Sequence, residues 1–204
     1  MLSTLLYMGA QAQESGFTHR FLELRQPADE DDDLLQLEFD RKEIRELVAD
    51  FESKEHTEEE WREYRQGKQL FEKAKQVNLV VDMEATLSSV QINGLLEPYE
   101  ELFSMQADET RMLVAGMMKN NKVKELVALM DDPEGEMLLF FSVLFKKPVT
   151  LEKYMKSPDG NMQLVRFNAP DKEDDAFIKM ENTGDEVSFG NTLFRFQITK
   201  TRTP

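Results

Sequence analysis

Two long apolar segments joined by an acidic turn constrain the fold of this chain more than any other feature. They lie in residues 122–148, KVKELVALMDDPEGEMLLFFSVLFKKP. Apolar residues recur at helical spacing in the first segment: Val123, Leu126, Val127 and Met130. Asp132 fits the N-cap of a second helix, with Pro133 at its first position. Residues 137–145 are apolar on nearly every side, which favours a helix in the centre of the core that ends at Pro148. The pattern predicts a helical hairpin.

The segments on either side of this hairpin differ in character. We expect further helices over residues 98–105 and 108–118, with Asn120 and Asn121 ending the second one. Residues 80–96 alternate between apolar and polar side chains and favour a strand. The C-terminal part shows short alternating segments separated by polar turns, at residues 161–168, 176–181, 186–189 and 192–199. These predict an antiparallel meander that packs on the helices.

The N-terminal part contains two short segments that flank a run of five acidic residues. Residues 19–25 and 34–39 alternate between apolar and polar side chains, and the acidic run, Asp29 to Asp33, lies between them. This pattern predicts a β-hairpin with a long acidic loop. A helix that starts at Asp33 and continues to Phe51 fits the same residues, and the sequence leaves both alternatives open.

Residues 40–76 show the strongest helical signals. Asp40 is a plausible N-cap with Glu43 three residues later, and Thr57 and Glu60 repeat this capping-box pattern. The pattern fits either one long charged helix or two helices with a break near His56.

Together these patterns predict an α+β protein. We expect an N-terminal hairpin and a long charged helix, a central helical core, and a C-terminal antiparallel β-meander. The chain divides into residues 1–39, an N-terminal segment with the hairpin and acidic loop; residues 40–76, a charged helical segment; and residues 77–204, a compact α+β body.

The charge of the chain limits its partners. The 204 residues carry a net charge of −15, and residues 23–60 alone hold 16 acidic and 5 basic side chains. Such acidity argues against direct binding of nucleic acid or of an anionic membrane. There is no cysteine, and the longest apolar run, residues 137–145, is too short to span a membrane. We therefore expect a soluble intracellular protein, cytoplasmic or nuclear.

No motif for catalysis or cofactor binding occurs in the sequence. The two histidines, His19 and His56, lie far apart without ligand spacing. The acidic run partly matches an EF-hand loop, because Asp29, Asp31 and Asp33 fit its first, third and fifth positions. Leu34 then stands where the sharp turn requires glycine. We expect no catalytic residue, no cofactor and no dedicated metal site, and leave weak cation binding at residues 29–33 open.

The function that fits these observations is that of a non-enzymatic interaction subunit or adaptor of a larger assembly. The acidic loop and the charged amphipathic helix would dock on a protein partner with a basic surface. The candidate contact residues are Asp29, Glu30, Asp31, Asp32, Asp33, Phe39, Trp61 and Tyr64. Self-association through a coiled-coil seam in residues 40–76 is also expected from its aromatic spacing. Two alternatives are an enzyme with a carboxylate-based divalent-metal site and an acidic mimic of nucleic acid.

Overall fold

The computed structural model describes residues 16–25, 34–84, 86–107, 110–132, 137–153, 162–163, 165–167, 179–182, 186–190 and 195–199. Its main strands are β1 (Leu34–Asp40), β2 (Ala74–Asp82), β3 (Glu100–Ala107), β4 (Thr110–Lys119), β5 (Lys122–Asp132) and β6 (Met137–Val149). They form one antiparallel sheet in the order β1-β2-β6-β5-β4-β3. The helices are α2 (Phe17–Leu24), α3 (Arg41–Glu52), α4 (Glu58–Phe71) and α5 (Ser89–Leu96).

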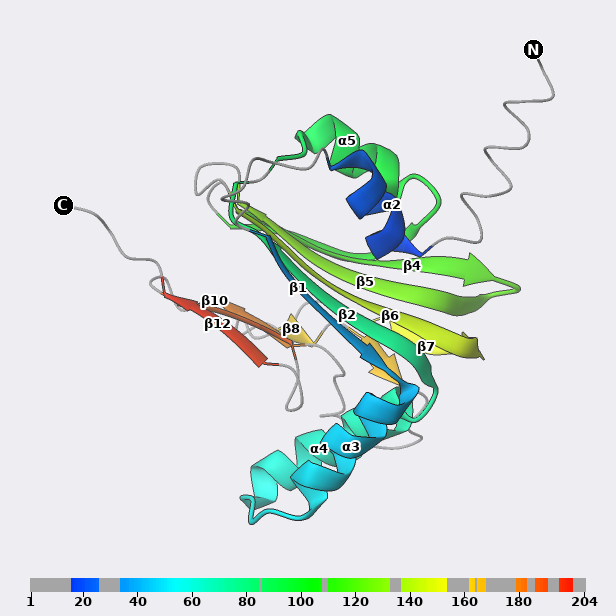
Figure 1. Ribbon diagram of the computed structural model, residues 1–204, viewed down its shortest axis with the longest axis vertical. Helices are drawn as coiled ribbons and strands as arrows, with labels where there is room; N and C mark the ends of the chain where they lie inside the picture. The colour runs from blue at the N-terminus through cyan, green and yellow to red at the C-terminus, as the bar shows by residue number, and fades with distance from the viewer. Residues whose placement is uncertain are drawn as a thin grey trace.

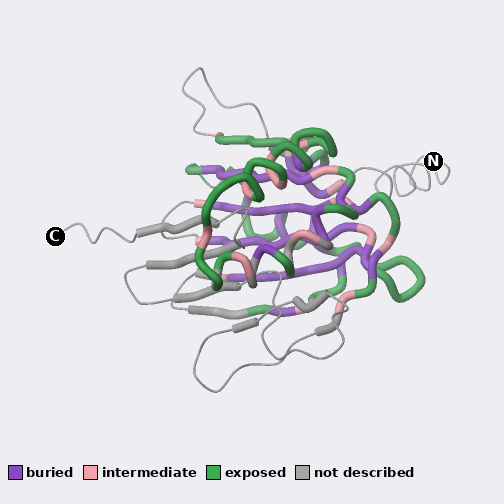
Figure 2. Tube along the Cα trace, turned by 90° about the horizontal axis from the view of Figure 1, so that it is seen from below, coloured by how far each residue is buried: buried purple, intermediate pink, exposed green. Residues whose placement is uncertain are grey.

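Both faces of this sheet are covered. Helices α2 and α5 lie on one face, while α3 and α4 extend from the end of β1 and β2 (Figure 1). A cluster centred on Phe17, Phe21 and Phe140 fills the space beneath α2 and α5. A second cluster, which includes Ile44 and Phe141, occupies the opposite face. Figure 2 shows the central strands buried along most of their length.

The predicted central helical core is wrong, because residues 122–148 form the antiparallel strands β5 and β6. In β5, Ala128 and Met130 face one cluster while Val127 and Leu129 face the other. A strand buried on both faces is apolar at consecutive positions, so it lacks the alternation that marks a half-buried strand. The apolar run therefore also matches the spacing of a helix.

The neighbouring helices predicted over 98–105 and 108–118 are strands as well, β3 and β4. Asn120 and Asn121 join β4 to β5, with φ of 53° and 59°. Positive φ at both central residues belongs to the two-residue turns that match the twist of a hairpin. The predicted strand over 80–96 is correct only to Asp82, since α5 follows with Ser88 as its N-cap.

The predicted N-terminal hairpin is also wrong. Phe17 and Phe21 are spaced four residues apart and both point into the core from a helix, α2, so the segment is not extended. The strand over 34–39 is confirmed as β1, which pairs with β2 along its whole length. The alternative helix from Asp33 to Phe51 is excluded by β1, and the acidic run Asp29–Asp33 lies outside the described residues.

The predicted single long charged helix is wrong, because residues 40–76 contain two helices, α3 and α4, with a break near His56. The other alternative that the sequence left open is therefore correct. Both predicted capping boxes are confirmed. The Asp40 carboxylate accepts from the Glu43 N–H at 2.9 Å, and the Thr57 hydroxyl accepts from the Glu60 N–H at 3.2 Å. The two helices pack against each other as a hairpin between β1 and β2 (Figure 1).

The C-terminal strands are β7 (Leu151–Lys153), β8 (Met162–Gln163), β9 (Val165–Phe167), β10 (Lys179–Asn182), β11 (Glu186–Gly190) and β12 (Arg195–Thr199). The predicted antiparallel meander is confirmed for β10, β11 and β12. Figure 1 places this small sheet on the side of the main sheet opposite α2 and α5, not on the helices. The main sheet takes strands from all three segments into which the sequence was divided.

Candidate functional site

An open pocket lies between α3 and α4. Its volume is about 430 Å³, and its lining residues are Arg41, Ile44, Arg45, Val48, Lys68, Phe71 and Glu72. Ile44 and Phe71 are buried and form an apolar floor. Three cationic side chains and one carboxylate surround that floor. The pocket therefore suits a ligand that combines an apolar group with negative charge.

The N-terminal half of α3 brings cations to this pocket. Arg41 and Arg45 are one helical turn apart, so both project from the same side of the helix as Ile44 and Val48. Arg41 and Lys42 occupy the first two positions of α3. The positive end of the helix dipole disfavours cations at these positions. Lys42 pairs with Glu46 at 3.5 Å along the helix, whereas Arg41 lines the pocket.

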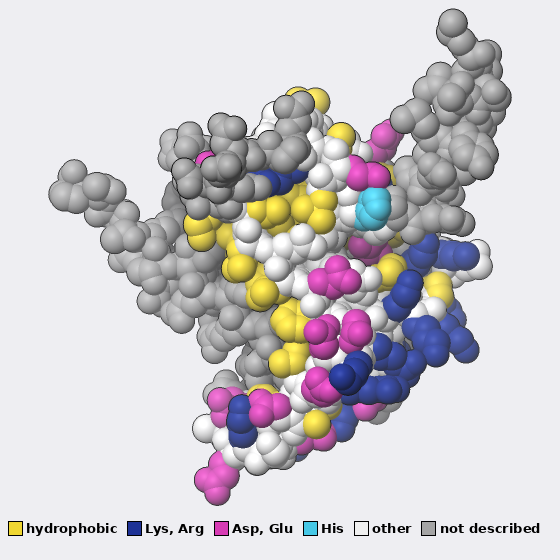
Figure 3. Space-filling view, in the orientation of Figure 1, with side chains coloured by type: hydrophobic (Ala, Val, Ile, Leu, Met, Phe, Trp, Pro, Cys, Tyr) yellow, Lys and Arg dark blue, Asp and Glu magenta, His cyan; other side chains and the backbone are white. Residues whose placement is uncertain are grey.

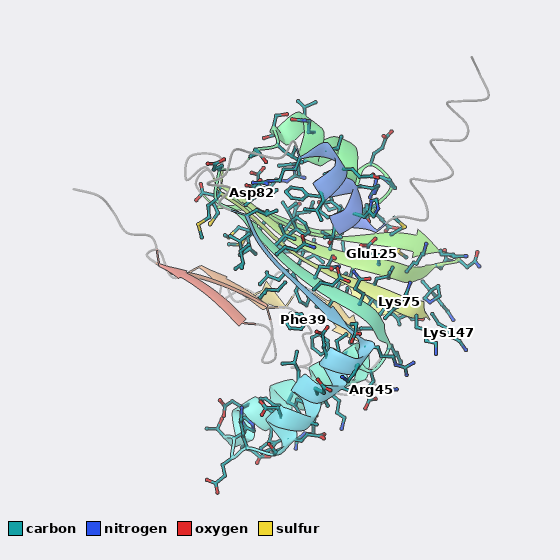
Figure 4. The ribbon with its side chains drawn as sticks, in the orientation of Figure 1. Phe39, Arg45, Lys75, Asp82, Glu125 and Lys147 are labelled. Carbon is teal, nitrogen blue, oxygen red and sulfur yellow. The ribbon has the colours of Figure 1, made fainter. Side chains whose placement is uncertain are left out.

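Sheet pairing brings more lysines beside the pocket. Asp40, the residue before α3, pairs with Gln76 in β2, and the Lys146 N–H donates to the Lys73 carbonyl at 3.0 Å. The ends of β1, β2 and β6 therefore meet at one end of the sheet. The resulting basic patch consists of Arg41, Arg45, Lys73, Lys75, Lys146 and Lys147. Figure 3 shows Lys and Arg side chains gathered over this end of the sheet, and Figure 4 shows Lys75 and Lys147 there.

Three lysines of the basic patch are not paired with a carboxylate. Within the part of the chain that the structure describes, Lys75, Lys146 and Lys147 form no ion pair with an acidic side chain. All three are exposed. A chain with a net charge of −15 thus presents a local positive surface, which attracts anions while the rest of the molecule repels them.

One cation of the pocket is fixed by its neighbours. Lys68 Nζ lies 2.5 Å from Glu52 Oε1, which also accepts from the Tyr64 hydroxyl at 2.6 Å. These hydrogen bonds from Lys68 and Tyr64 lower the pKa of Glu52, and the bond to Glu52 raises the pKa of Lys68. The ammonium group of Lys68 therefore stays charged at neutral pH and holds a set position at the rim of the pocket.

Two of the contact residues predicted from the sequence lie together. Trp61 and Tyr64 belong to an aromatic cluster with Phe51 and His56, which joins α3 to α4. The Phe51 ring stacks on His56 and Tyr64, at 3.6 and 4.6 Å between centroids, and Trp61 meets Tyr64 edge-on at 5.5 Å. Tyr64 is only 2% exposed, whereas Trp61 is half-buried. The cluster stabilises the helical hairpin, and its contact with a partner stays a prediction.

Phe39 lies elsewhere, half-buried against the cluster that contains Ile44. The remaining predicted contacts, Asp29–Asp33, fall outside the described residues. The basic patch is not apparent in the sequence, because its cations come from three segments that meet only in the folded sheet. The pair Lys146-Lys147 after an apolar strand was the one local signal.

A buried polar network beneath α2 was also not predicted. Glu125 accepts from the Phe17 N–H at 2.9 Å and from the Tyr99 hydroxyl at 2.6 Å. The guanidinium of Arg20 lies over the Tyr99 ring, 5.4 Å from its centroid. Burial raises the pKa of Glu125 and that of Tyr99. Glu125 thus binds a backbone N–H at the N-terminus of α2 and fixes the helix to the sheet.

Further polar contacts attach α2 along its length. The hydroxyl groups of Thr18 and Ser142 lie 3.0 Å apart, and Ser142 also accepts from Asn78 at 3.0 Å. At the other end of α2, Arg25 donates to Asp82 at 3.3 Å, with both side chains buried. Each of these groups has a partner that positions α2, so we interpret the network as structural.

Comparisons with protein-family models, curated proteins and solved structures found no match. Among the described residues, none of the helices has the length and apolar character needed to cross a membrane. Over the same residues, no group of three or more His, Asp or Glu side chains is arranged to hold a metal ion.

Proposed function

We propose that this chain is a non-enzymatic interaction subunit that binds an acidic segment of a partner protein at the basic patch. The observation that carries this proposal is the gathering of exposed cations around a pocket with an apolar floor, on a chain with a net charge of −15. A carboxylate-rich segment would pair with Arg45 and Lys75, while one of its apolar side chains would enter the pocket above Ile44 and Phe71.

The apolar floor favours a protein segment over nucleic acid. A phosphodiester backbone has no aliphatic side chain that could fill a pocket whose floor consists of Ile44 and Phe71. A long nucleic acid would also extend past the basic patch onto acidic surface, where the charge of the chain repels it. A short acidic segment avoids both problems because its contacts end with the patch.

This proposal keeps the predicted class of function but changes the charge of the partner. The contact between Asp29–Asp33 and a basic surface remains a prediction on residues outside the described part. None of the described features favours the alternatives of a metal-dependent enzyme or a nucleic-acid mimic. The basic patch favours an acidic partner instead.

Fluorescence anisotropy with a labelled peptide tests the proposal. The probe is a short Glu/Asp peptide with one central leucine, and the comparison peptide carries serine in its place. The variant R45E/K75E is expected to weaken binding of the leucine peptide by about tenfold or more, since two attractive contacts become repulsive. The serine peptide is expected to bind more weakly than the leucine peptide to the unmodified chain.

A matched control separates local contacts from the overall charge. K54E/R65E makes the same change of charge at side chains that are 60% and 61% exposed on the far part of the helical hairpin. It is expected to leave binding nearly unchanged. Equal weakening by the two variants contradicts the proposal, and so does tighter binding of a single-stranded oligonucleotide than of the leucine peptide.

A further inference from the structure

We propose that the pocket between α3 and α4 binds the C-terminal residue of a partner chain, with its apolar side chain on the floor and its terminal carboxylate against Arg41 and Arg45. This inference rests on the proposed function and extends it, because it states which part of the acidic segment enters the pocket. A chain terminus carries a charged carboxylate on the same Cα as its last side chain, whereas an internal residue has only an uncharged carbonyl there.

Two arginines in the wall of the pocket have no ion-pair partner among the described residues. Across the same residues, neither Arg41 nor Arg45 forms a side-chain hydrogen bond, and both are exposed. A ligand that binds there has no existing partner to displace. The guanidinium groups therefore keep the N–H donors with which arginine binds a carboxylate.

The acidic side chains of the same stretch of α3 are used elsewhere. Asp40 accepts from the N–H groups of Lys42 and Glu43 at 2.7 and 2.9 Å, and Glu43 accepts from the Asp40 N–H at 2.8 Å. Glu46 lies 3.5 Å from Lys42. None of these three carboxylates belongs to the lining of the pocket. They cap the helix or pair with Lys42, so they do not neutralise the two arginines of the pocket.

The opposite wall of the pocket, on α4, has a different balance of charge. The bond to Glu52 and, more weakly, the charge of Glu72 raise the pKa of Lys68. Lys68 is therefore compensated by two carboxylates, in contrast to the arginines on α3. Glu72 is exposed and lines the pocket, so its carboxylate can accept a backbone N–H from a ligand. A bound terminus is thus oriented with its carboxylate towards α3 and its N–H towards α4.

A C-terminal residue matches the pocket at all three of its groups. Its carboxylate faces the two arginines, its N–H faces Glu72, and its side chain covers Ile44 and Phe71 on the floor. Arg41, Ile44 and Arg45 occupy positions i, i+3 and i+4 of α3, so the charged and the apolar surfaces lie side by side. An internal leucine covers the same floor but places no charge of its own beside the arginines.

The size of the pocket also favours a single residue. Its volume of about 430 Å³ lies near the lower end of the range for ligand pockets, roughly 300–1,000 Å³. This volume suits one side chain with its carboxylate, and not the apolar face of a helix, which presents side chains from several turns. The acidic residues before the terminus then continue over Lys75 and Lys147, which Figure 4 shows at this end of the sheet.

Fluorescence anisotropy with two further Glu/Asp peptides, labelled at their N-termini, tests the inference. One ends in leucine with a free carboxylate. The other ends in leucine amide and carries one extra glutamate, so that both peptides have the same net charge. The free acid is expected to bind about fivefold more tightly than the amide. R41Q/R45Q is expected to abolish this preference with an unchanged circular dichroism spectrum. K54Q/R65Q, at side chains that are 60% and 61% exposed on the far part of the helical hairpin, is expected to keep it.

This inference and the proposed function fail in different ways. Equal affinities for the free acid and the amide overturn the inference, whereas binding of the central-leucine peptide that R45E/K75E weakens still supports the proposed function. If none of the peptides binds, both are overturned.

Competition with small acids tests the role of Glu72. N-acetyl-leucine is expected to displace the free-acid peptide at a lower concentration than isocaproate, which is leucine without its amino group and therefore has no N–H for Glu72. Displacement by isocaproate at an equal or lower concentration would assign the pocket to a small amphiphilic acid and overturn the inference.

Discussion

The position of α2 makes a quantitative prediction for Phe21→Ala. Phe21 is 0% exposed, and its ring meets Phe140 edge-on at 4.9 Å between centroids. Truncation of a buried phenylalanine to alanine costs about 3–5 kcal/mol in the free energy of unfolding. Alanine has the higher helix propensity, which offsets about 0.5 kcal/mol. We therefore expect a net loss of about 2.5–4.5 kcal/mol.

Urea denaturation followed by circular dichroism measures this loss. With a denaturant slope of about 2 kcal/mol/M, the midpoint is expected to fall by about 1–2 M. Leu24→Ala is the matched control on the same helix, because Leu24 is 45% exposed. Its cost is expected to be within about 0.5 kcal/mol. Equal midpoints for the two variants would refute the packing of α2 against the sheet, since the sequence alone does not distinguish these positions.

Substitutions at three further positions test other parts of the structure. Thr57→Ala removes the acceptor for the Glu60 N–H and is expected to cost about 0.5–2 kcal/mol by urea denaturation, with equal stability as the contradicting result. Asn121→Val forces a branched side chain to φ 59° and is expected to cost about 1–2 kcal/mol, whereas Asn121→Gly is expected to be tolerated. Burial raises the pKa of Glu125, so the folded protein takes up this proton before the unfolded chain does as the pH falls. As the pH falls from neutral to 4.5, the ordinary pKa of the group, the unmodified chain is therefore expected to gain stability relative to Glu125→Gln. A difference in stability that stays constant over this range would contradict the burial of the charge.

The sequence predicted the elements whose signals are local. Asp40 and Thr57 each carry their partner three residues later, so the start of α3 and α4 required no knowledge of the rest of the fold. The alternation of the last strands is equally local. These patterns report hydrogen bonds or solvent exposure within a few residues, and tertiary contacts did not override them.

The central strands could not be assigned from periodicity. β5 is apolar at every position from Leu126 to Met130 because both of its faces are covered there, and such a run fits a buried helix equally well. Two residues carried the missing information. Asn120 and Asn121 between two apolar runs are typical of a hairpin turn, and they were interpreted as the end of a helix. Glu125 was a further signal, because it lies two residues before Val127 on the same face of β5, which is the spacing of a strand.

The net charge of the whole chain concealed the basic patch. Lys75 and Lys146 come from distant segments that become neighbours only because Ala74 pairs with Phe145. A net charge of −15 describes the whole chain, but it does not describe the local charge at one end of the sheet. The sequence therefore predicted an interaction protein with a basic partner, whereas we propose an acidic partner from the described surface.

The placement of Arg41 and Lys42 fits the binding role that we propose for this end of the sheet. Cations in the first turn of a helix oppose the dipole at a cost of about 0.3–1 kcal/mol each, and acidic residues there would stabilise α3. Asp40 already supplies the cap, so the helix start does not require these cations. They lie where β1 ends, and Arg41 lines the pocket. The unfavourable position of Arg41 fits the proposal that binding at the basic patch, and not folding alone, determines this residue.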